Sequence, residues 1–173
     1  DEGISYIEIR TLDINPFYKC GLVQHDMEFL HLFLIYMLIK NESDYEDWQK
    51  EAKINEEMAA EKAYDDSMRL IKDGEEITLK KWASEIINEM YGMCEVLNID
   101  ADNTLKLMHD RVSNPELTYG QRLLKLISER GYINTHTMLS MNHKKTSKDF
   151  VNNMNIEDCD LYKKYVPIAL FNR

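Results

Sequence analysis

The chain has 173 residues, which is enough for one domain and short for two. Hydrophobic residues make up 44% and charged residues 30%, as in ordinary globular proteins, and the net charge is −10. Nucleic-acid backbones and anionic membranes both attract basic surfaces, so the charge argues against either as a partner. The negative net charge does not argue against a bound nucleotide, because nucleotide binding requires only a local cation or a metal.

Cysteine usage and hydropathy bear on the compartment. Cys20, Cys94 and Cys159 are far apart and form no CxxC pair, so a zinc ribbon or a thioredoxin-like motif is absent. An odd, small number of cysteines favours a reducing environment, and we expect a cytoplasmic location. We expect no signal segment at the start of the chain. The longest apolar run, residues 29–39, is shorter than the ~20 residues that span a bilayer.

The first predicted element is a β-strand over residues 4–12. Side chains alternate along a strand, so Glu8 and Arg10 share one face, flanked by apolar residues. Residues 15–17, Asn-Pro-Phe, predict a turn because proline fixes φ and lacks an N–H. A single strand cannot pair its own backbone groups, so we expect it to pair with strands outside this chain.

Helices are predicted for most of the remaining chain. Residues 26–40 are apolar on nearly every side, which predicts a helix buried on more than one face. The acidic stretch 41–66 indicates a solvated helix in preference to an acidic interaction surface. A break is predicted at residues 73–74, Asp-Gly.

Capping residues define the next helix. Thr78 can cap a helix with an apolar repeat close to 3.6 residues, and a further helix covers about residues 102–112. The residues of that apolar stripe are Trp82, Ile86, Met90, Met93 and Leu97.

Two more helices follow a turn at Asn114-Pro115. Thr118 and Gln121 form a T-x-x-Q capping box, and Gly131 provides the stop. The buried stripe of this helix is predicted to be Leu123, Leu124 and Ile127. The last helix covers residues 135–151, and residues 165–171 form at most an edge strand. The predicted fold class is therefore mostly α with an N-terminal β-strand, in a single, partial domain over residues 1–173.

The common sequence motifs for metal binding, nucleotide binding and nucleophilic catalysis are absent. His25 and His31 face different sides of a helix, whereas His136 and His143 are two turns apart, ~10 Å, so we expect no histidine to ligate a metal. The sequence has neither G-x-x-x-x-G-K-[ST] nor G-x-G-x-x-G, and no nucleophile motif.

Glu8 and Arg10 remain, with two interpretations. They could form a solvated ion pair of nearly neutral energy. Alternatively, residues i and i+2 of a strand lie ~7 Å apart, a gap that fits Mg²⁺ held by the glutamate and a phosphate reaching the arginine. The residue pattern by itself leaves both open.

Residues 6–17, YIEIRTLDINPF, resemble the Y-I-E-[VI]-R-[ST]-x-D-x-N-P-F motif of bacterial glutamate–cysteine ligases (γ-glutamylcysteine synthetases). FLHLFLIYMLI, residues 29–39, is similar to the family's helix after that motif. NPELTYGQRLLKLI, residues 114–127, resembles its N-P-[ED]-L-T-x-x-x-R-[IL]-L segment. The order and spacing correspond to the C-terminal third of the ligase domain, and no motif matches residues 44–74.

The resemblance implies a function and a fold. It implies the C-terminal portion of a glutamine-synthetase-like α+β fold, in which Glu8 is a ligand of an active-site Mg²⁺ and Arg10 contacts the transferring phosphate of ATP. The implied reaction joins the γ-carboxylate of glutamate to the amine of cysteine, the first step of glutathione synthesis. The other metal and substrate ligands would lie upstream, so this chain alone is expected to be inactive. A fused ATP-grasp glutathione synthetase domain is also compatible.

An alternative from another class of protein stays open on the residues. The chain could be a non-catalytic, acidic helical interaction module whose strand adds to the edge of a partner's sheet.

Overall fold

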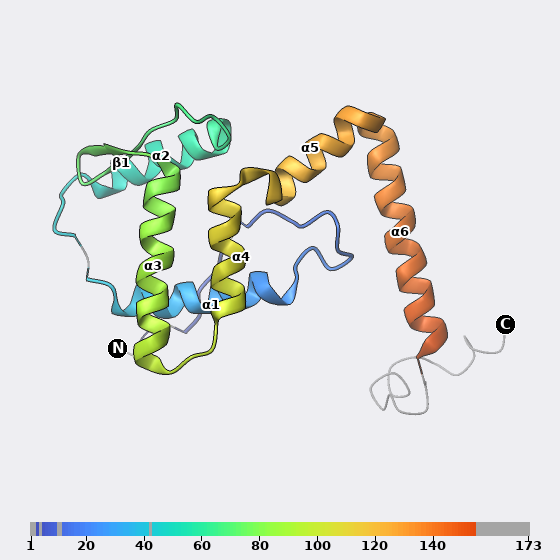
Figure 1. Cartoon of the computed structure of the whole chain (residues 1–173), viewed down its shortest axis with the longest axis horizontal. Coiled ribbons are helices and arrows are strands. Elements are labelled where there is room, and N and C mark those ends of the chain that lie inside the picture. The colour runs from blue at the N-terminus through green and yellow to red at the C-terminus, as the bar shows by residue number, and fades with distance from the viewer. Residues whose placement is uncertain (1–2, 4, 10–11, 42, 155–173) are drawn as a thin grey trace.

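The computed structural model describes residues 3, 5–9, 12–41 and 43–154. These residues are mostly helical and include a small two-stranded antiparallel sheet (Figure 1). In chain order the elements are α1 (Gln24–Ile39), α2 (Trp48–Lys62), β1 (Leu70–Lys72), β2 (Glu75–Ile77), α3 (Leu79–Leu97), α4 (Asp102–Ser113), a 3₁₀ turn η1 (Pro115–Leu117), α5 (Tyr119–Arg130) and α6 (Tyr132–Asn153).

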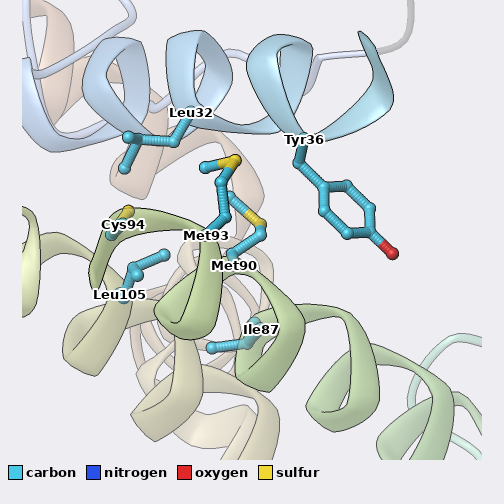
Figure 2. Packing of buried hydrophobic residues seen from close by; sticks show 7 residues of the cluster. All are labelled: Leu32, Tyr36, Ile87, Met90, Met93, Cys94 and Leu105. Carbon is cyan, nitrogen blue, oxygen red and sulfur yellow. The ribbon is translucent and has the colours of Figure 1, made fainter. Parts of the chain in front are cut away.

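The hydrophobic core lies where α3 and α4, side by side, cross α1 (Figure 1). Met90 and Leu105 are completely buried at its centre. Full burial of such a side chain stabilises the fold by about 1.5–3 kcal/mol, so this three-helix contact is the main source of stability in the described residues. Figure 2 shows the cluster, which consists of Leu32, Tyr36, Ile87, Met90, Met93, Cys94 and Leu105.

A polar contact closes the edge of this core between α1 and α3. The Tyr36 hydroxyl and the Lys40 ammonium both donate to Oε2 of Glu89, each at 2.5 Å. The hydrogen bond from Lys40, followed by that from Tyr36, holds the pKa of Glu89 below its usual range. The carboxylate therefore stays ionised, and the C-terminal end of α1 is fixed to the middle of α3.

The predicted helix after Thr78 is confirmed, and its buried face is wider than the predicted stripe. The Thr78 hydroxyl accepts from the Lys81 amide at 3.2 Å, as expected of an N-cap. Met90 and Met93 are buried, whereas Leu97 is 47% exposed. Because α3 packs against both α1 and α4, its buried face also includes Ile87 and Cys94.

The N-terminal strand predicted over residues 4–12 is absent from its described residues, 5–9 and 12. Residues 5–9 are irregular, and among the described residues only β1 and β2 pair as strands. The physical reason is the lack of a neighbour: backbone N–H and C=O groups form a ladder only beside another strand. The edge strand predicted for residues 165–171 lies outside the described residues.

A β-hairpin occupies the position of the predicted break. β1 and β2 pair with Leu70 opposite Ile77, joined by a turn at Asp73 and Gly74, whose φ angles are 52° and 84°. An Asp-Gly pair suits such a turn because both central residues need positive φ.

Helix α2 is largely solvated, as predicted, and two polar side chains connect it to the hairpin. Glu51, 9% exposed, accepts from the amides of Asp73 at 3.1 Å and Gly74 at 2.6 Å. Asn55 exchanges two hydrogen bonds with the backbone of Ile71 at 2.7 and 2.8 Å, in the manner of a third strand.

Helices α5 and α6 form a hairpin of their own at one end of the molecule (Figure 1). The Thr118 side chain accepts from the Gln121 amide at 3.4 Å, which confirms the Thr118 half of the predicted capping box. The Thr118 amide donates to the carbonyl of Pro115 at 3.0 Å and not to the Gln121 side chain.

Gly131, with φ 79°, ends α5 and is also the N-cap of α6. Helix α6 therefore begins at Tyr132, three residues before the predicted start at residue 135. No residue of α5 is fully buried, and Leu124 of its predicted stripe is 53% exposed.

Helix α1 was predicted to be buried on more than one face, and the structure agrees only in part, since Leu30 and Leu34, away from the core face, are half-buried. One face packs into the core, whereas Met37, Leu38 and Ile39 are exposed. Within the part of the chain that the structure describes, no helix is both long and apolar enough to cross a membrane.

Candidate functional site

The segment that carries Glu8 is uncovered on both faces. Tyr6 is 80% exposed and Ile7, whose side chain would point to the opposite face of a strand, is 60% exposed. Glu8 is exposed as well. Arg10, the second predicted site residue, lies outside the described residues.

The turn that follows this segment is well ordered by its own hydrogen bonds. The amide of Asn15 donates to the carbonyl of Gly21 at 2.7 Å, and the amide of Gly21 donates to the carbonyl of Tyr18 at 3.0 Å. The Asn15 side chain accepts from the Phe17 amide at 3.0 Å and is completely buried. Asparagine favours such a turn because its side-chain oxygen can accept a hydrogen bond from the backbone amide two residues later, as a backbone carbonyl would.

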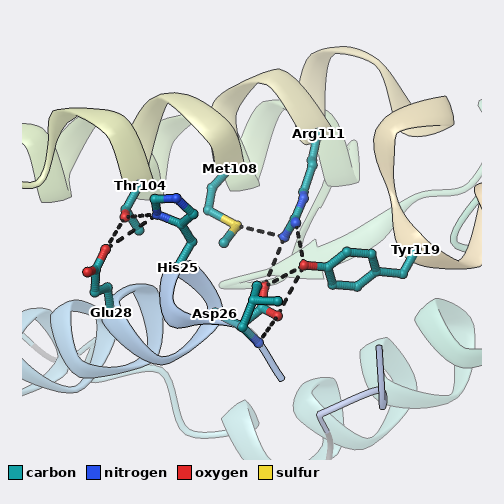
Figure 3. Close-up of polar contacts among 8 residues, drawn as sticks. His25, Asp26, Glu28, Thr104, Met108, Arg111 and Tyr119 are labelled. Atoms are coloured by element: carbon teal, nitrogen blue, oxygen red, sulfur yellow. Dashed lines mark hydrogen bonds and ion pairs between the residues drawn. The ribbon is translucent and has the colours of Figure 1, made fainter. Parts of the chain in front are cut away.

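Two ionisable groups missed by the sequence analysis fix the start of α1. Asp26 and Arg111 form an ion pair at 3.2 Å, with side chains 12% and 17% exposed, and Tyr119 reaches both carboxylate oxygens of Asp26 at 3.1 Å (Figure 3). Asp26 also accepts from the amide of Val23 at 3.2 Å. The cluster therefore joins α1, α4 and α5 next to the turn.

A second polar cluster lies beside the first, in the same first turns of α1. His25 Nδ1 lies 2.8 Å from the hydroxyl of Thr104, which donates to Oε2 of Glu28 (Figure 3). The hydrogen bond from Thr104, followed by that from Gln24, lowers the pKa of Glu28. His25 is thus engaged in helix packing between α1 and α4.

Arg111→Ala is expected to lower the free energy of unfolding by ~2 kcal/mol, because it leaves the carboxylate of Asp26 largely buried without its cation. Urea unfolding of this chain measures the change. Lys106→Ala, which removes a charge from an exposed position of the same helix, is the matched control. Equal losses for the two variants would assign the Asp26–Arg111 pair no net role in stability.

No group of three or more histidine, cysteine, aspartate or glutamate side chains that could hold a metal occurs within the described ranges. Glu8 can supply one oxygen ligand of the kind that Mg²⁺ prefers. A complete magnesium site requires further ligands than these residues bring together.

An apolar cavity of ≈ 690 Å³ lies between α1, α3 and α4. Phe29, Phe33, Ile86 and Met108 contribute to its wall, and none of residues 5–22 lines it. It is therefore separate from the segment that carries Glu8.

Comparison with known proteins gives concordant results. Residues 1–60 match the glutamate-cysteine ligase family. The chain is 33% identical over 165 residues to the glutathione biosynthesis bifunctional protein of Clostridium perfringens, covering 92% of this chain and 20% of that protein. It is 28% identical over 149 residues to the glutamate–cysteine ligase of Pseudoalteromonas translucida, covering 82% of this chain and 28% of that protein.

The fold agrees with these relatives. The crystal structure of the glutamate–cysteine ligase of Francisella tularensis in complex with AMP matches with a TM-score of 0.77 and 23% identity, over 84% of this chain and 30% of that one. The described helices thus have the fold of a segment of a ligase of this kind. Taken with the sequence matches, the chain is similar in sequence and fold to one segment of the bacterial glutamate–cysteine ligases. It spans only 20% and 28% of the length of these two curated relatives.

Proposed function

We propose that this chain is part of the domain of an ATP-dependent ligase that joins the γ-carboxylate of glutamate to the amine of cysteine. The observation that carries the proposal is the family match over residues 1–60, which includes the motif with Glu8 and Arg10. The acidic surface of the chain suits the alternative of an interaction module, but the family match favours the ligase.

In the complete domain, we propose that the segment around Glu8 becomes a strand of a glutamine-synthetase-like sheet. Support comes from its exposure on both faces, since Tyr6 and Ile7 are apolar side chains without cover. Adjacent strands from upstream chain would pair the backbone of residues 5–9 and cover these side chains.

Glu8 and Arg10 have separate roles in this proposal. Glu8 is one carboxylate ligand of Mg²⁺, and ligands outside this chain complete the site. When bound, the metal would neutralise phosphate charge. Arg10 pairs with the transferring phosphate through its planar fork of N–H donors, which holds the phosphate and stabilises charge that develops on it. Positioning and charge neutralisation are the main contributions a protein makes to phosphoryl transfer.

The substrates follow from the relatives. The Francisella ligase was solved with AMP, which supports ATP as the nucleotide substrate here. Glutamate and cysteine are the amino-acid substrates that the names of the relatives indicate. We propose the cytoplasm as the compartment, since it keeps a cysteine substrate reduced.

The test is phosphate release from ATP by the full-length protein that contains this chain. Release that requires glutamate, cysteine and Mg²⁺ together, with γ-glutamylcysteine as the product, supports the proposal. Binding of a protein partner without any such turnover would favour the interaction module.

Glu8→Gln in the full-length ligase is expected to shift the activity midpoint to at least ~10-fold higher Mg²⁺, because the amide keeps the shape but not the charge that a hard cation prefers. Activity titrated against Mg²⁺ measures the shift, and a thermal melt beside it checks the fold. Glu2→Gln changes another acid of the same segment and serves as the control. An unmoved midpoint would make Glu8 a structural residue.

A further inference from the structure

We propose that Arg122 and His143 are positioning residues that clamp the turn at residues 15–21 and, through it, hold the segment bearing Glu8 and Arg10. This inference rests on the proposed ligase function. It assigns a role to Arg122 of the second family motif, residues 114–127, of which the site described above uses only Tyr119.

Arg122 connects the two motifs directly. Its guanidinium carbon lies 4.3 Å from the ring centre of Phe17, the last residue of the first motif. The two residues are 105 positions apart in the sequence, yet α5 brings them together. A cation over an aromatic face is attracted by the ring, and arginine does this while its charge stays in water. Arg122 is indeed exposed, so the contact does not require a buried charge.

His143 holds the same turn from α6. Its Nε2 lies 2.9 Å from the carbonyl oxygen of Pro16, which can only accept, so Nε2 donates. Two helical turns further along α6, the ring centre of Phe150 lies 4.6 Å from the ammonium of Lys19, which belongs to the same turn. Figure 1 shows the loop before α1 reaching out from the core helices toward this hairpin.

The clamp acts on a turn that can transmit position. The hydrogen bond from the Asn15 amide to the Gly21 carbonyl joins the two ends of the turn, and Asn15 is completely buried. The two ends of the turn therefore cannot move independently. Only four residues separate Asn15 from Arg10. At ~3.3 Å per residue, a fixed Asn15 limits where the catalytic segment can lie. In this proposal helices α5 and α6 act on the catalytic segment through the turn.

The first experiment uses this chain and does not depend on activity. Hydrogen exchange at the amides of Asn15 and Gly21 is expected to be at least ~10-fold faster in Arg122→Ala/His143→Leu than in the unmodified chain, whereas core amides of α3 are unchanged. Arg122→Lys/His143→Gln keeps a cation and an amide donor at the same places and is expected to restore slow exchange. Lys125→Ala/Lys145→Ala, which changes exposed positions of the same helices, is the control. Exchange equal to that of the unmodified chain would overturn the clamp.

The second experiment uses the full-length ligase. Arg122→Ala/His143→Leu is expected to lower kcat by at least ~10-fold with KM for glutamate and cysteine within twofold, since misplacement acts on the reacting groups. The conservative pair is expected to recover most of kcat. Faster exchange with unchanged kcat would mean that the clamp has no role in positioning. If the full-length protein has no ligase activity at all, the proposed function fails, and the exchange experiment still decides whether the clamp exists.

Discussion

The isolated chain of 173 residues is expected to make no γ-glutamylcysteine and to release no phosphate above background from ATP with glutamate, cysteine and Mg²⁺. Two features of the structure lead to this expectation. The described residues contain no metal-holding group of three or more histidine, cysteine or acidic side chains. Residues 5–9 form no strand and Glu8 is exposed, so no sheet holds its carboxylate in the geometry that a metal site needs. Loose positioning costs ~10²-fold in rate, and an incomplete metal site adds to that loss.

The control for this experiment is the full-length protein, assayed at equal molar concentration under the same conditions. Circular dichroism of the isolated chain should still report a helical protein, because the core between α1, α3 and α4 is contained within it. Turnover by the isolated chain near the rate of the full-length protein would contradict its interpretation as part of an active site.

The helices could be predicted from local signals. Thr78 and Thr118 as caps, and Gly131 as a stop, act over three or four residues, and the structure has helix boundaries at each of them. The hairpin at residues 70–77 could not be predicted as strands, because three residues are too few for an alternating pattern. The turn itself was readable from Asp73 and Gly74.

Contacts between distant residues were beyond the sequence. Asp26 and Arg111 are 85 positions apart, and nothing in either neighbourhood indicates a partner. The same is true of Phe17 and Arg122, although the resemblance marked both as parts of motifs. The burial of α1 was overestimated because the apolar faces of a helix show which surfaces can be buried. They do not show whether this chain contains the elements that would pack against those faces.

The N-terminal strand illustrates the difference between propensity and structure. Alternation at residues 4–12 predicts a strand, and the structure has none at residues 5–9, since a strand needs a neighbouring strand to pair its backbone groups and no described strand lies beside this segment. The roles of Glu8 and Arg10 came from the family motif, and they stay predictions until the two residues are changed.

Arg10→Lys in the full-length ligase is expected to lower kcat by ~10²-fold while KM for glutamate and cysteine changes little. Lysine keeps the positive charge but replaces a planar fork of donors by a single ammonium, which cannot pair with two phosphate oxygens at once. Removing one donor from a site of developing charge typically costs ~10²–10³-fold in kcat. Because the lost contact serves the transition state more than substrate binding, the effect belongs in kcat. Arg130→Lys, an arginine at the end of α5, is the matched control. Steady-state phosphate release with each substrate varied in turn separates kcat from KM, and an Arg10→Lys enzyme with an unchanged kcat would remove Arg10 from the active site.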